Sequence, residues 1–525
     1  MKKKKKKQET ISTPDLLGRG ATCVYLAVML GIFPVFYRDN LFGISSVKRS
    51  FFLIVTAIYL CMMAIPFFGR SLEWLKKKKM PGWKACDIFA GLLLLSVIFS
   101  TIFALDVKEA ILGVSVRKVG AIAMLLCLLV FYAVRNYTIF HRIWFCAYLA
   151  GSACIYLFGV LVTCGINVLN IQEGIDPSQL SMFVSPLGNI NINAAYISLM
   201  LPAAMVFFLL CKEKAYKWLL AAYLYLGFAA AVCIRSDSVI VVVFAVFVLF
   251  LYFALGNRDW LLQFTYTAGI YTAANLTVFL LRLCLKTRMY PFGGLVALVL
   301  KPQVICLELL VCGILFLICC LLKKKEAAAG PEALEQNMLR LRKWYGLLLL
   351  VLFAAGVIVL IGLNLFFRDA VSGTVLDQLI LRDETGSGRG YIWIRTVELY
   401  GKLPLKHKIF GCGLSCFYNF VYPTYGADML EKINSVFYDA HNDFLNMLAT
   451  TGIVGITAFF GLIISTIVNA VRKWKEQPVQ IAVVLALAAF LVQGLVNSYS
   501  IFTLPLLFII LGLSYSPILE GQAAQ

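Results

Sequence analysis

The sequence predicts an all-α membrane protein, a polytopic transmembrane helix bundle with about fourteen spans and one large external loop that contains short helices. Two observations predict this class. Hydrophobic residues make up 61% of the chain and charged residues 14%, whereas soluble proteins are roughly half apolar and a quarter charged. The apolar residues also form blocks of about 16 to 24, long enough to cross a hydrocarbon core of about 30 Å as helices. This composition excludes a water-soluble fold.

The predicted spans are distributed along most of the chain, and Pro34, Pro302 and Pro505 mark kinks or starts among them. In chain order the spans are Ala21 to Tyr37, Phe51 to Gly69, Ile88 to Leu105, Val119 to Val134, Ile143 to Gly165, Asn193 to Cys211, Leu219 to Ile234, Val239 to Gly256, Leu261 to Leu281, Pro302 to Leu322, Trp344 to Phe367, Gly452 to Val471, Ile481 to Asn497 and Ile501 to Tyr515. The chain then divides into a polybasic tail (1–20), helices (21–366), a large external loop (367–451), helices (452–516) and a short tail (517–525).

The distribution of Lys and Arg predicts the orientation, because short cytoplasmic loops are enriched in them. If the N-terminus is cytoplasmic, nearly every dense basic run, such as Lys2 to Lys7 and the linker Lys323 to Lys343, falls on that side. Three external loops, near Arg38, Arg117 and Arg288, are mildly basic against this trend. The net charge of +20 is therefore a topology signal, with the lysine tail on anionic lipid, and nucleic-acid binding is the poorer interpretation.

The cysteines and two of the histidines predict little chemistry. Most of the 16 cysteines lie in apolar runs, where a thiol behaves as a small hydrophobe. Cys412 and Cys416, in the external loop, are either a disulfide or two inert buried thiols. His141 is expected to contact lipid headgroups, and His407, between two lysines, is expected to be solvated. No Cys/His metal spacing or DxD cluster occurs, so the sequence predicts neither a metal nor a cofactor.

His441 and Arg235 are candidate functional residues at the predicted outer face. His441 lies in "YDAHNDFL", where a neighbouring carboxylate could orient the imidazole and raise its basicity, as a general base requires. The alternative is a capping and hydrogen-bonding role. Arg235 lies in a short turn between two spans and could bind an anion through its guanidinium. Its alternatives are snorkelling or an ion pair with Asp237.

Arg389 is the third candidate, with a glycine on each side in "TGSGRGYIW". Glycines allow the backbone to approach a ligand closely, although a mobile loop tip is the default interpretation. Arg235, Arg389 and His441 are far apart in sequence, yet the topology places all three at one membrane face. Two guanidiniums and one imidazole suit a lipid that carries a diphosphate, together with a hydroxyl acceptor.

The arrangement of these residues resembles the bacterial O-antigen ligase and O-antigen polymerase family of membrane glycosyltransferases. The similar stretch runs from about Ser185 to Tyr515 and is clearest in the external loop. Its elements are Arg389 with Trp393, Pro404 followed by Phe410, Gly411, Gly413 and Phe417, then Ala440, His441, Asn442 and Leu445 ahead of Gly452 and Gly455, with "GNININAAYISLMLP" and Arg235 upstream. The chain departs from the family pattern at Ile234, often Ser, and at Thr451, often acidic.

The resemblance implies a C-type glycosyltransferase fold in the bacterial cytoplasmic (inner) membrane, with its active site on the periplasmic face. It also implies an undecaprenyl-diphosphate-linked glycan as donor and a lipid, glycan or protein hydroxyl as acceptor. By position, Arg235 and Arg389 would hold the leaving diphosphate, and His441 would activate the acceptor. Trp393 and Asn442 are expected to contact substrate. A transporter or flippase of lipid-linked sugars, and a membrane subunit without activity, remain alternatives.

Overall fold

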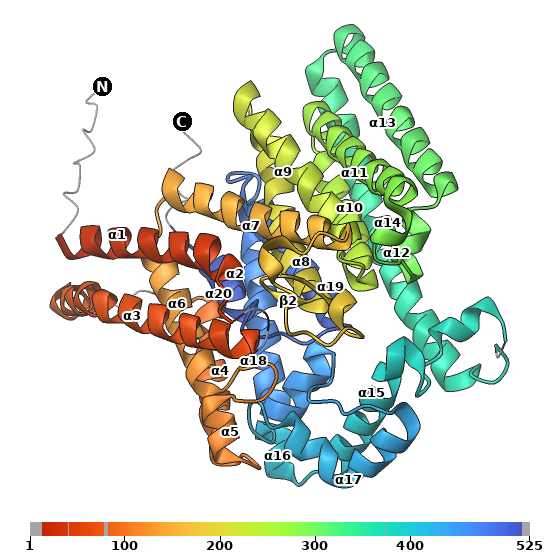
Figure 1. The fold of residues 1–525 in the computed structure, drawn as a ribbon. Coiled ribbons are helices and arrows are strands. Elements are labelled where there is room, and N and C mark those ends of the chain that lie inside the picture. The colour runs from red at the N-terminus through yellow and green to blue at the C-terminus, as the bar shows by residue number, and fades with distance from the viewer. Residues whose placement is uncertain (1–12, 40, 42, 78–81, 372, 517–525) are drawn as a thin grey trace.

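The structure is a computed structural model that describes residues 13–39, 41, 43–77, 82–371 and 373–516 (Figure 1). Most of the predicted polybasic tail and the whole predicted C-terminal tail lie outside these ranges. The described chain is almost entirely helical. Its only strands form one small antiparallel pair, in which Ser185 is opposite Gly188. The predicted all-α class is confirmed.

The described elements up to the first long crossover are α1 (Thr13–Ala27), the π-helix η1 (Val28–Ile32), α2 (Phe33–Val35), α3 (Ile44–Lys77), α4 (Ala85–Ile102), α5 (Val107–Leu112), α6 (Ala121–Tyr137), α7 (Arg142–Thr163), η2 (Val168–Asn170), η3 (Leu180–Met182), β1 (Phe183–Ser185), β2 (Gly188–Asn189) and α8 (Ile190–Leu210). Those that follow are α9 (Lys214–Cys233), α10 (Asp237–Ala254), α11 (Arg258–Leu285), η4 (Lys286–Arg288), α12 (Gly294–Val299), α13 (Pro302–Ala329), α14 (Pro331–Phe366), η5 (Val375–Leu379), α15 (Thr385–Lys402), α16 (Leu405–Phe410), α17 (Phe417–Ile433), α18 (Asp443–Lys473), α19 (Gln480–Gly494) and α20 (Leu504–Leu513).

Eleven helices in the described part of the chain are long and apolar enough to cross a membrane. They coincide with eleven of the predicted spans, and the remaining three spans coincide with the shorter apolar helices α6, α19 and α20. The chain is thus a multi-pass membrane protein. The total of about fourteen crossings stays a prediction for the three shorter helices.

Proline marks helix starts and kinks where the sequence predicts them. Pro302 and Pro505 occupy the first turns of α13 and α20, where their missing amide costs nothing. Pro34 follows the π-helical turn η1. The basic segment Lys323 to Lys343, in contrast, is not a separate linker. It continues α13 and begins α14, interrupted only near Gly330 (φ +85°), because its Ala, Leu, Lys and Glu residues are good helix formers.

The loop helices α15, α16 and α17 gather with α5 at one end of the bundle, at the bottom of Figure 1. They form a second small core, distinct from the main one, around buried side chains such as Tyr391, Phe417 and Met429. The predicted external loop is therefore an ordered helical layer. Its last residues already belong to α18, which begins at Asp443 rather than at Gly452.

A backbone break at Gly452 divides α18 into a short N-terminal part and a long C-terminal part. Gly452 has φ +67°, a left-handed value that favours glycine. The break frees carbonyl groups of the preceding turn, and donors from the loop satisfy them. The amide of Cys412 donates to the carbonyl of Ala449 (3.0 Å), and that of Gly413 donates to Thr450 (2.9 Å). Because an unsatisfied backbone group is costly in a membrane protein, this pairing fastens the loop to α18.

We expect Gly452→Ala to destabilise the protein. A Cβ at this position would lie 2.3 Å from the carbonyl oxygen of Ile409, and the left-handed backbone alone costs roughly 1–3 kcal/mol in a residue with a side chain. The unfolding temperature of the purified protein in detergent measures the effect. Gly356→Ala is the control, because its Cβ would have no neighbour within 4 Å. Equal unfolding temperatures for the two variants would contradict this account of the break.

Candidate active site

Arg235 lies in the turn between α9 and α10, with φ +59°. Its guanidinium donates to the carbonyl of Ser181 and lies 4.8 Å from the ring centre of Tyr290. Burial lowers the pKa of this group, and its buried Nε has no hydrogen-bond partner in the described chain. Arg235 and Asp237 form no ion pair in the described chain, and the Asp237 carboxylate accepts the amide of Val296 instead. An arginine stays charged even so, and this one has a free nitrogen for an anion.

Polar side chains connect the Arg235 turn with the end of the loop that precedes α18. The hydroxyl of Ser236 donates to Oδ1 of Asn191 (3.1 Å), and Nδ2 of Asn497 donates to the carbonyl of Asn191 (3.3 Å). The side chain of Asn497 in turn lies beside the imidazole of His441. Polar contacts through Asn191 and Asn497 therefore connect the turn that holds Arg235 with His441. The guanidinium of Arg235 itself contacts Ser181 and Tyr290.

Asp439 holds the turn that contains His441. His441 has φ +46°, and its backbone amide donates to Oδ1 of Asp439 at 2.8 Å. Arg117, between α5 and α6, binds the same carboxylate through Nε (2.7 Å) and Nη2 (3.1 Å). Asp439 is only 4% exposed, so this two-fold contact neutralises a buried charge. The carboxylate thus orients the backbone of His441, whereas the sequence predicted that it orients the ring.

The His441 imidazole is neutral at physiological pH. Burial lowers its pKa to about 4 against the opposing charge of Asp439, and Arg117 and Arg389 lower it further. Asp439 does raise the pKa of His441, as the sequence predicts, but the effect of burial is larger. Burial would raise the pKa of Asp439, but Arg117 and His441 hold it well below its usual range. Nδ1 of His441 is buried and has no hydrogen-bond partner among the described residues, so one ring nitrogen can accept a proton.

Arg389 is the first residue after a left-handed stretch formed by Gly386, Ser387 and Gly388, with φ of 63°, 59° and 84°. The glycine-rich segment, for which a loop tip is the default prediction from the sequence, is built into the start of α15. The guanidinium of Arg389 lies near Asp439, and burial lowers its pKa. It makes no hydrogen bond or ion pair with any residue that the structure describes. Arg389 is thus available to an external anion.

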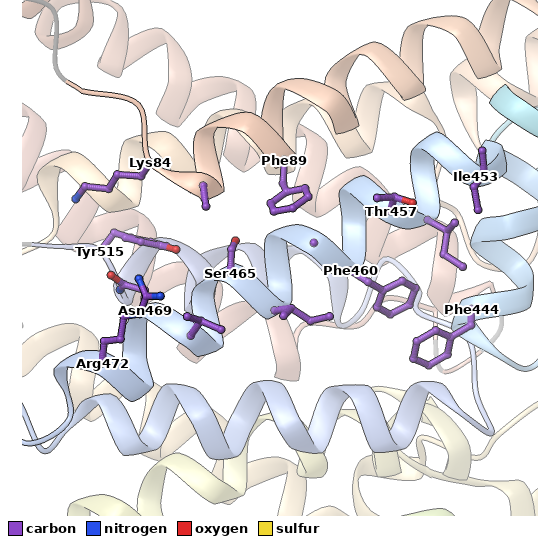
Figure 2. A pocket seen from close by; sticks show the side chains of 15 residues that line it. Lys84, Phe89, Phe444, Ile453, Thr457, Phe460, Ser465, Asn469, Arg472 and Tyr515 are labelled. Carbon is purple, nitrogen blue, oxygen red and sulfur yellow. The ribbon is translucent and has the colours of Figure 1, made fainter. Parts of the chain in front are cut away.

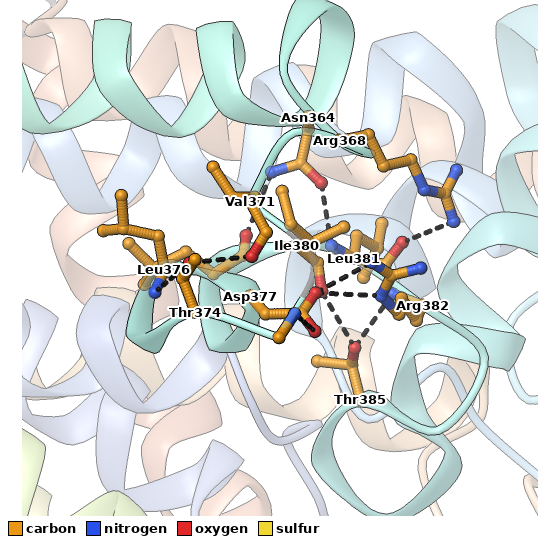
Figure 3. Close-up of polar contacts among 12 residues, drawn as sticks. Asn364, Arg368, Val371, Thr374, Leu376, Asp377, Ile380, Leu381, Arg382 and Thr385 are labelled. Carbon is orange, nitrogen blue, oxygen red and sulfur yellow. Dashed lines mark hydrogen bonds and ion pairs between the residues drawn. The ribbon is translucent and has the colours of Figure 1, made fainter.

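A hydrogen-bond network holds the chain ahead of Arg389 (Figure 3). Asn364, near the end of α14, accepts the amide of Leu381 (2.8 Å). The carbonyl oxygen of Arg382 lies so close to Gly390 that a Cβ there would approach it to 1.8 Å. Further contacts of the network come from Arg368, Val371, Thr374, Leu376, Asp377, Ile380 and Thr385. The network and the glycine together set where α15 begins, and so where Arg389 lies.

The protein itself engages Trp393 and Asn442, which the sequence predicts to bind substrate. Nε1 of Trp393 donates to the carbonyl of Ala440 (2.8 Å). Asn442 is the N-cap of α18: its Oδ1 accepts the amide of Leu445 (3.0 Å), and its Nδ2 donates to the carbonyl of Leu495 (2.9 Å). Both side chains therefore hold the turn ahead of α18. A contact with substrate stays a prediction for them.

The site carries unbalanced positive charge. Asp439 balances Arg117, whereas Arg235 and Arg389 have no carboxylate within 4 Å in the described ranges. The buried amide oxygens of Gln493 and Asn497 also have no hydrogen-bond partner there. Buried polar atoms are normally paired. Several unpaired ones in one region are therefore typical of a place where a polar ligand binds. Two guanidiniums of this kind suit a dianionic group such as a diphosphate.

Comparison with known proteins identifies one part of the chain. Residues 304–460 match the O-Antigen ligase family model. The match confirms the predicted family resemblance for this O-antigen ligase domain, which includes Arg389 and His441. Arg117 and Arg235 lie outside it, as does more than half of the chain. No curated protein matches the sequence.

Two expectations about the domain are now decided. His407 is not solvated: it is 8% exposed, and its Nδ1 lies 2.9 Å from the carbonyl oxygen of Gly411 at the end of α16. Its ring satisfies a helix end, which is why it is buried. Cys412 and Cys416 are free, and burial raises their pKa values to about 12 and about 11. Of the two predicted alternatives, a disulfide or two inert buried thiols, the structure has the two thiols.

Sequence reasoning did not identify Arg117, Asn191 or Asn497 as members of the site. Arg117 left a signal, because it lies in a predicted external loop where the charge distribution disfavours a basic residue. A charge that opposes the topology bias is a candidate for a buried pair or a ligand contact. Asn191 lies inside "GNININAAYISLMLP", an element of the family resemblance, so its segment left a signal, whereas Asn497 lies at the end of an apolar run and left none.

The described residues contain no group of three or more His, Cys, Asp or Glu that could hold a metal ion. A metal-free reaction stays a prediction, and it requires a direct test. Among the described carboxyl groups of this region, Asp439 is paired with Arg117, and the buried Asp443 accepts the amide of Tyr499.

We expect Arg117→Gln to destabilise the protein strongly, by roughly 3–5 kcal/mol, because it leaves the buried carboxylate of Asp439 without its cation. The unfolding temperature should fall, and the double variant Arg117→Gln/Asp439→Asn should recover much of the loss. Arg38→Gln is the matched control, since the Arg38–Asp39 pair is highly exposed. Equal unfolding temperatures for Arg117→Gln and Arg38→Gln would show that the Arg117–Asp439 pair does not stabilise the fold.

Proposed function

We propose that this protein is a glycosyltransferase that moves a glycan from an undecaprenyl-diphosphate carrier to an acceptor hydroxyl on the outer face of the bacterial cytoplasmic membrane. The O-antigen ligase match supports the class of protein. One observation carries the proposal. Arg389, which pairs with no carboxylate among the described residues, lies close enough to His441 to lower its pKa, and a chain of polar contacts connects the Arg235 turn to the same imidazole.

The proposed reaction exchanges one carbon–oxygen bond for another. The acceptor oxygen bonds to the anomeric carbon of the donor sugar while the bond from that carbon to the diphosphate oxygen breaks. Undecaprenyl diphosphate leaves with the bonding electrons, and Nδ1 of His441 takes the acceptor proton. Arg235 and Arg389 stabilise the negative charge that develops on the leaving diphosphate.

The other residues of the site position these groups in the proposal. Arg117 and Asp439 hold the backbone of His441, while Trp393 and Asn442 fasten the same turn to α15 and to the segment after α19. The acceptor class decides between two forms of the activity. A ligase would transfer to a lipid or protein, and a polymerase would transfer to a second lipid-linked glycan.

We expect Arg235→Ala, Arg389→Ala and His441→Ala each to reduce transfer at least about a hundredfold, as the loss of a charge stabiliser or a general base does. The assay follows release of undecaprenyl diphosphate from a synthetic undecaprenyl-diphosphate-linked oligosaccharide by the purified protein. That oligosaccharide, or a membrane glycolipid, serves as acceptor. Arg38→Ala is the matched control, because this arginine is highly exposed and pairs with its neighbour Asp39.

The chelator EDTA should leave the rate unchanged if no metal takes part. Loss of activity with EDTA, restored by a divalent cation, would refute the metal-free reaction. Wild-type rates in all three variants, with purified protein that is folded, would refute the assignment of the site. Movement of the intact donor across a vesicle membrane without release of undecaprenyl diphosphate would favour the transporter.

We expect kcat/KM to stay nearly constant from about pH 5.5 to 7.5. This quantity reports the free enzyme, in which His441 must be neutral to accept a proton, and burial lowers its pKa to about 4. Activity should therefore fall only as the pH drops toward that value, provided that the protein stays folded. A decline centred near 6.5, the ordinary value for histidine, would contradict a buried base.

A further inference from the structure

An apolar groove runs along α18 on the side that faces α4 (Figure 2). Its volume is about 880 Å³. The apolar part of its lining comes from Phe89 on α4 and from Phe444, Ile453, Ile456, Phe460, Ile464 and Val468 on α18. The groove begins near the outer end of α18, at Phe444, and continues to the opposite end of the helix, at Arg472. Its length and lining suit a hydrocarbon chain.

The end of the groove far from His441 is basic. Lys84 and Arg472 line it together with Tyr515, as Figure 2 shows. Both basic side chains are exposed, and Arg472 makes no hydrogen bond or ion pair within the described chain. The nearby carboxylate of Asp87 is already paired with Arg135. This end therefore presents two positive charges beside an apolar channel.

We propose that the groove binds an anionic phospholipid, with its phosphate at Lys84 and Arg472 and an acyl chain along Phe89 and Phe460. Acidic lipids are attracted to basic residues next to membrane helices, and the apolar lining removes the acyl chain from the bulk bilayer. The polar lining residues Ser465 and Asn469 lie near the same end, where a phospholipid carries its glycerol and headgroup oxygens.

The positive end distinguishes this ligand from an isoprenoid tail. A polyprenyl chain that entered from the outer end would place only hydrocarbon beside Lys84 and Arg472, and their charges would have no counterpart. A phospholipid matches both parts of the groove at once. The inference therefore rests on charge complementarity and does not depend on the proposed transfer reaction.

The two helices that form the groove are held together at defined points. A Cβ on Gly461 would lie 2.4 Å from the ring of Phe89, so glycine at this position allows α18 and α4 to approach closely. Nearer the outer end, the hydroxyl of Ser96 on α4 donates to the carbonyl of Thr451 (3.3 Å), directly before the break at Gly452. The headgroup end of a bound lipid would lie between the Gly461–Phe89 contact and the basic end of the groove, where it touches both α4 and α18.

Native mass spectrometry of the full-length protein in detergent tests the site, with dioleoyl phosphatidylglycerol as probe and dioleoyl phosphatidylcholine as its neutral counterpart. We expect the wild type to retain phosphatidylglycerol preferentially. Lys84→Gln/Arg472→Gln should weaken that binding by roughly thirtyfold, from two juxtamembrane charges. Lys475→Gln, which removes an exposed charge that does not line the groove, is the control. Ile464→Trp should also reduce binding, because it fills the groove without changing charge.

Three results would overturn the proposal. They are equal retention of the two phospholipids by the wild type, unchanged phosphatidylglycerol binding in Lys84→Gln/Arg472→Gln, and displacement of phosphatidylglycerol from the wild type by uncharged undecaprenol. The last result would assign the groove to an isoprenoid instead. Since the two basic residues are exposed, their replacement leaves the helix packing intact, and an unfolding temperature equal to that of the wild type checks this.

Discussion

The buried ion pair between Arg117 and Asp439 is the interaction on which the candidate site depends. Arg117 comes from the N-terminal helices and Asp439 from the end of the external loop, so the pair joins parts of the chain that are 322 residues apart. The same carboxylate accepts the backbone amide of His441. The position of the His441 backbone thus follows from this contact, whereas burial is the main cause of the lowered pKa of its imidazole. Without its cation, a carboxylate this buried would not stay charged in place.

Unusual backbone conformations occur repeatedly around this contact. Arg235 and His441 both have left-handed φ values although neither is a glycine, and Gly452 breaks the helix that follows. Such conformations cost roughly 1–3 kcal/mol each and persist only where the surroundings enforce them. Here the surroundings are identifiable. Asp439 holds His441, the carbonyl of Ser181 holds the guanidinium of Arg235, and the loop amides hold the break at Gly452.

The sequence predicted the membrane helices well, because long apolar blocks have few alternatives in a bilayer. It also singled out Arg235, Arg389 and His441, which stand out against an apolar background, and their role in a site stays a proposal. It did not predict the contact of Arg117 with Asp439. Pairing across 322 residues is a property of helix packing, which composition and spacing do not encode.

Local patterns misled in two further places. His407 lies between lysines and was expected in solvent, yet it caps α16 and is buried. The Lys323 to Lys343 segment was expected to be a linker because it is polar, yet its helix-forming residues extend α13 and α14. In both cases a polar segment was assumed to be exposed to solvent. A hydrogen bond buries His407 instead, and helix propensity makes the Lys323 to Lys343 segment helical.

The central claim is that the guanidiniums of Arg235 and Arg389 and the imidazole of His441 serve one diphosphate-binding site. An electron cryo-microscopy map of the protein with bound undecaprenyl diphosphate tests it most directly. We expect the diphosphate to lie within hydrogen-bonding distance of both guanidiniums and next to His441, with Arg117 still bound to Asp439. A diphosphate bound elsewhere, or held by only one of the two arginines with the other turned away, would contradict it.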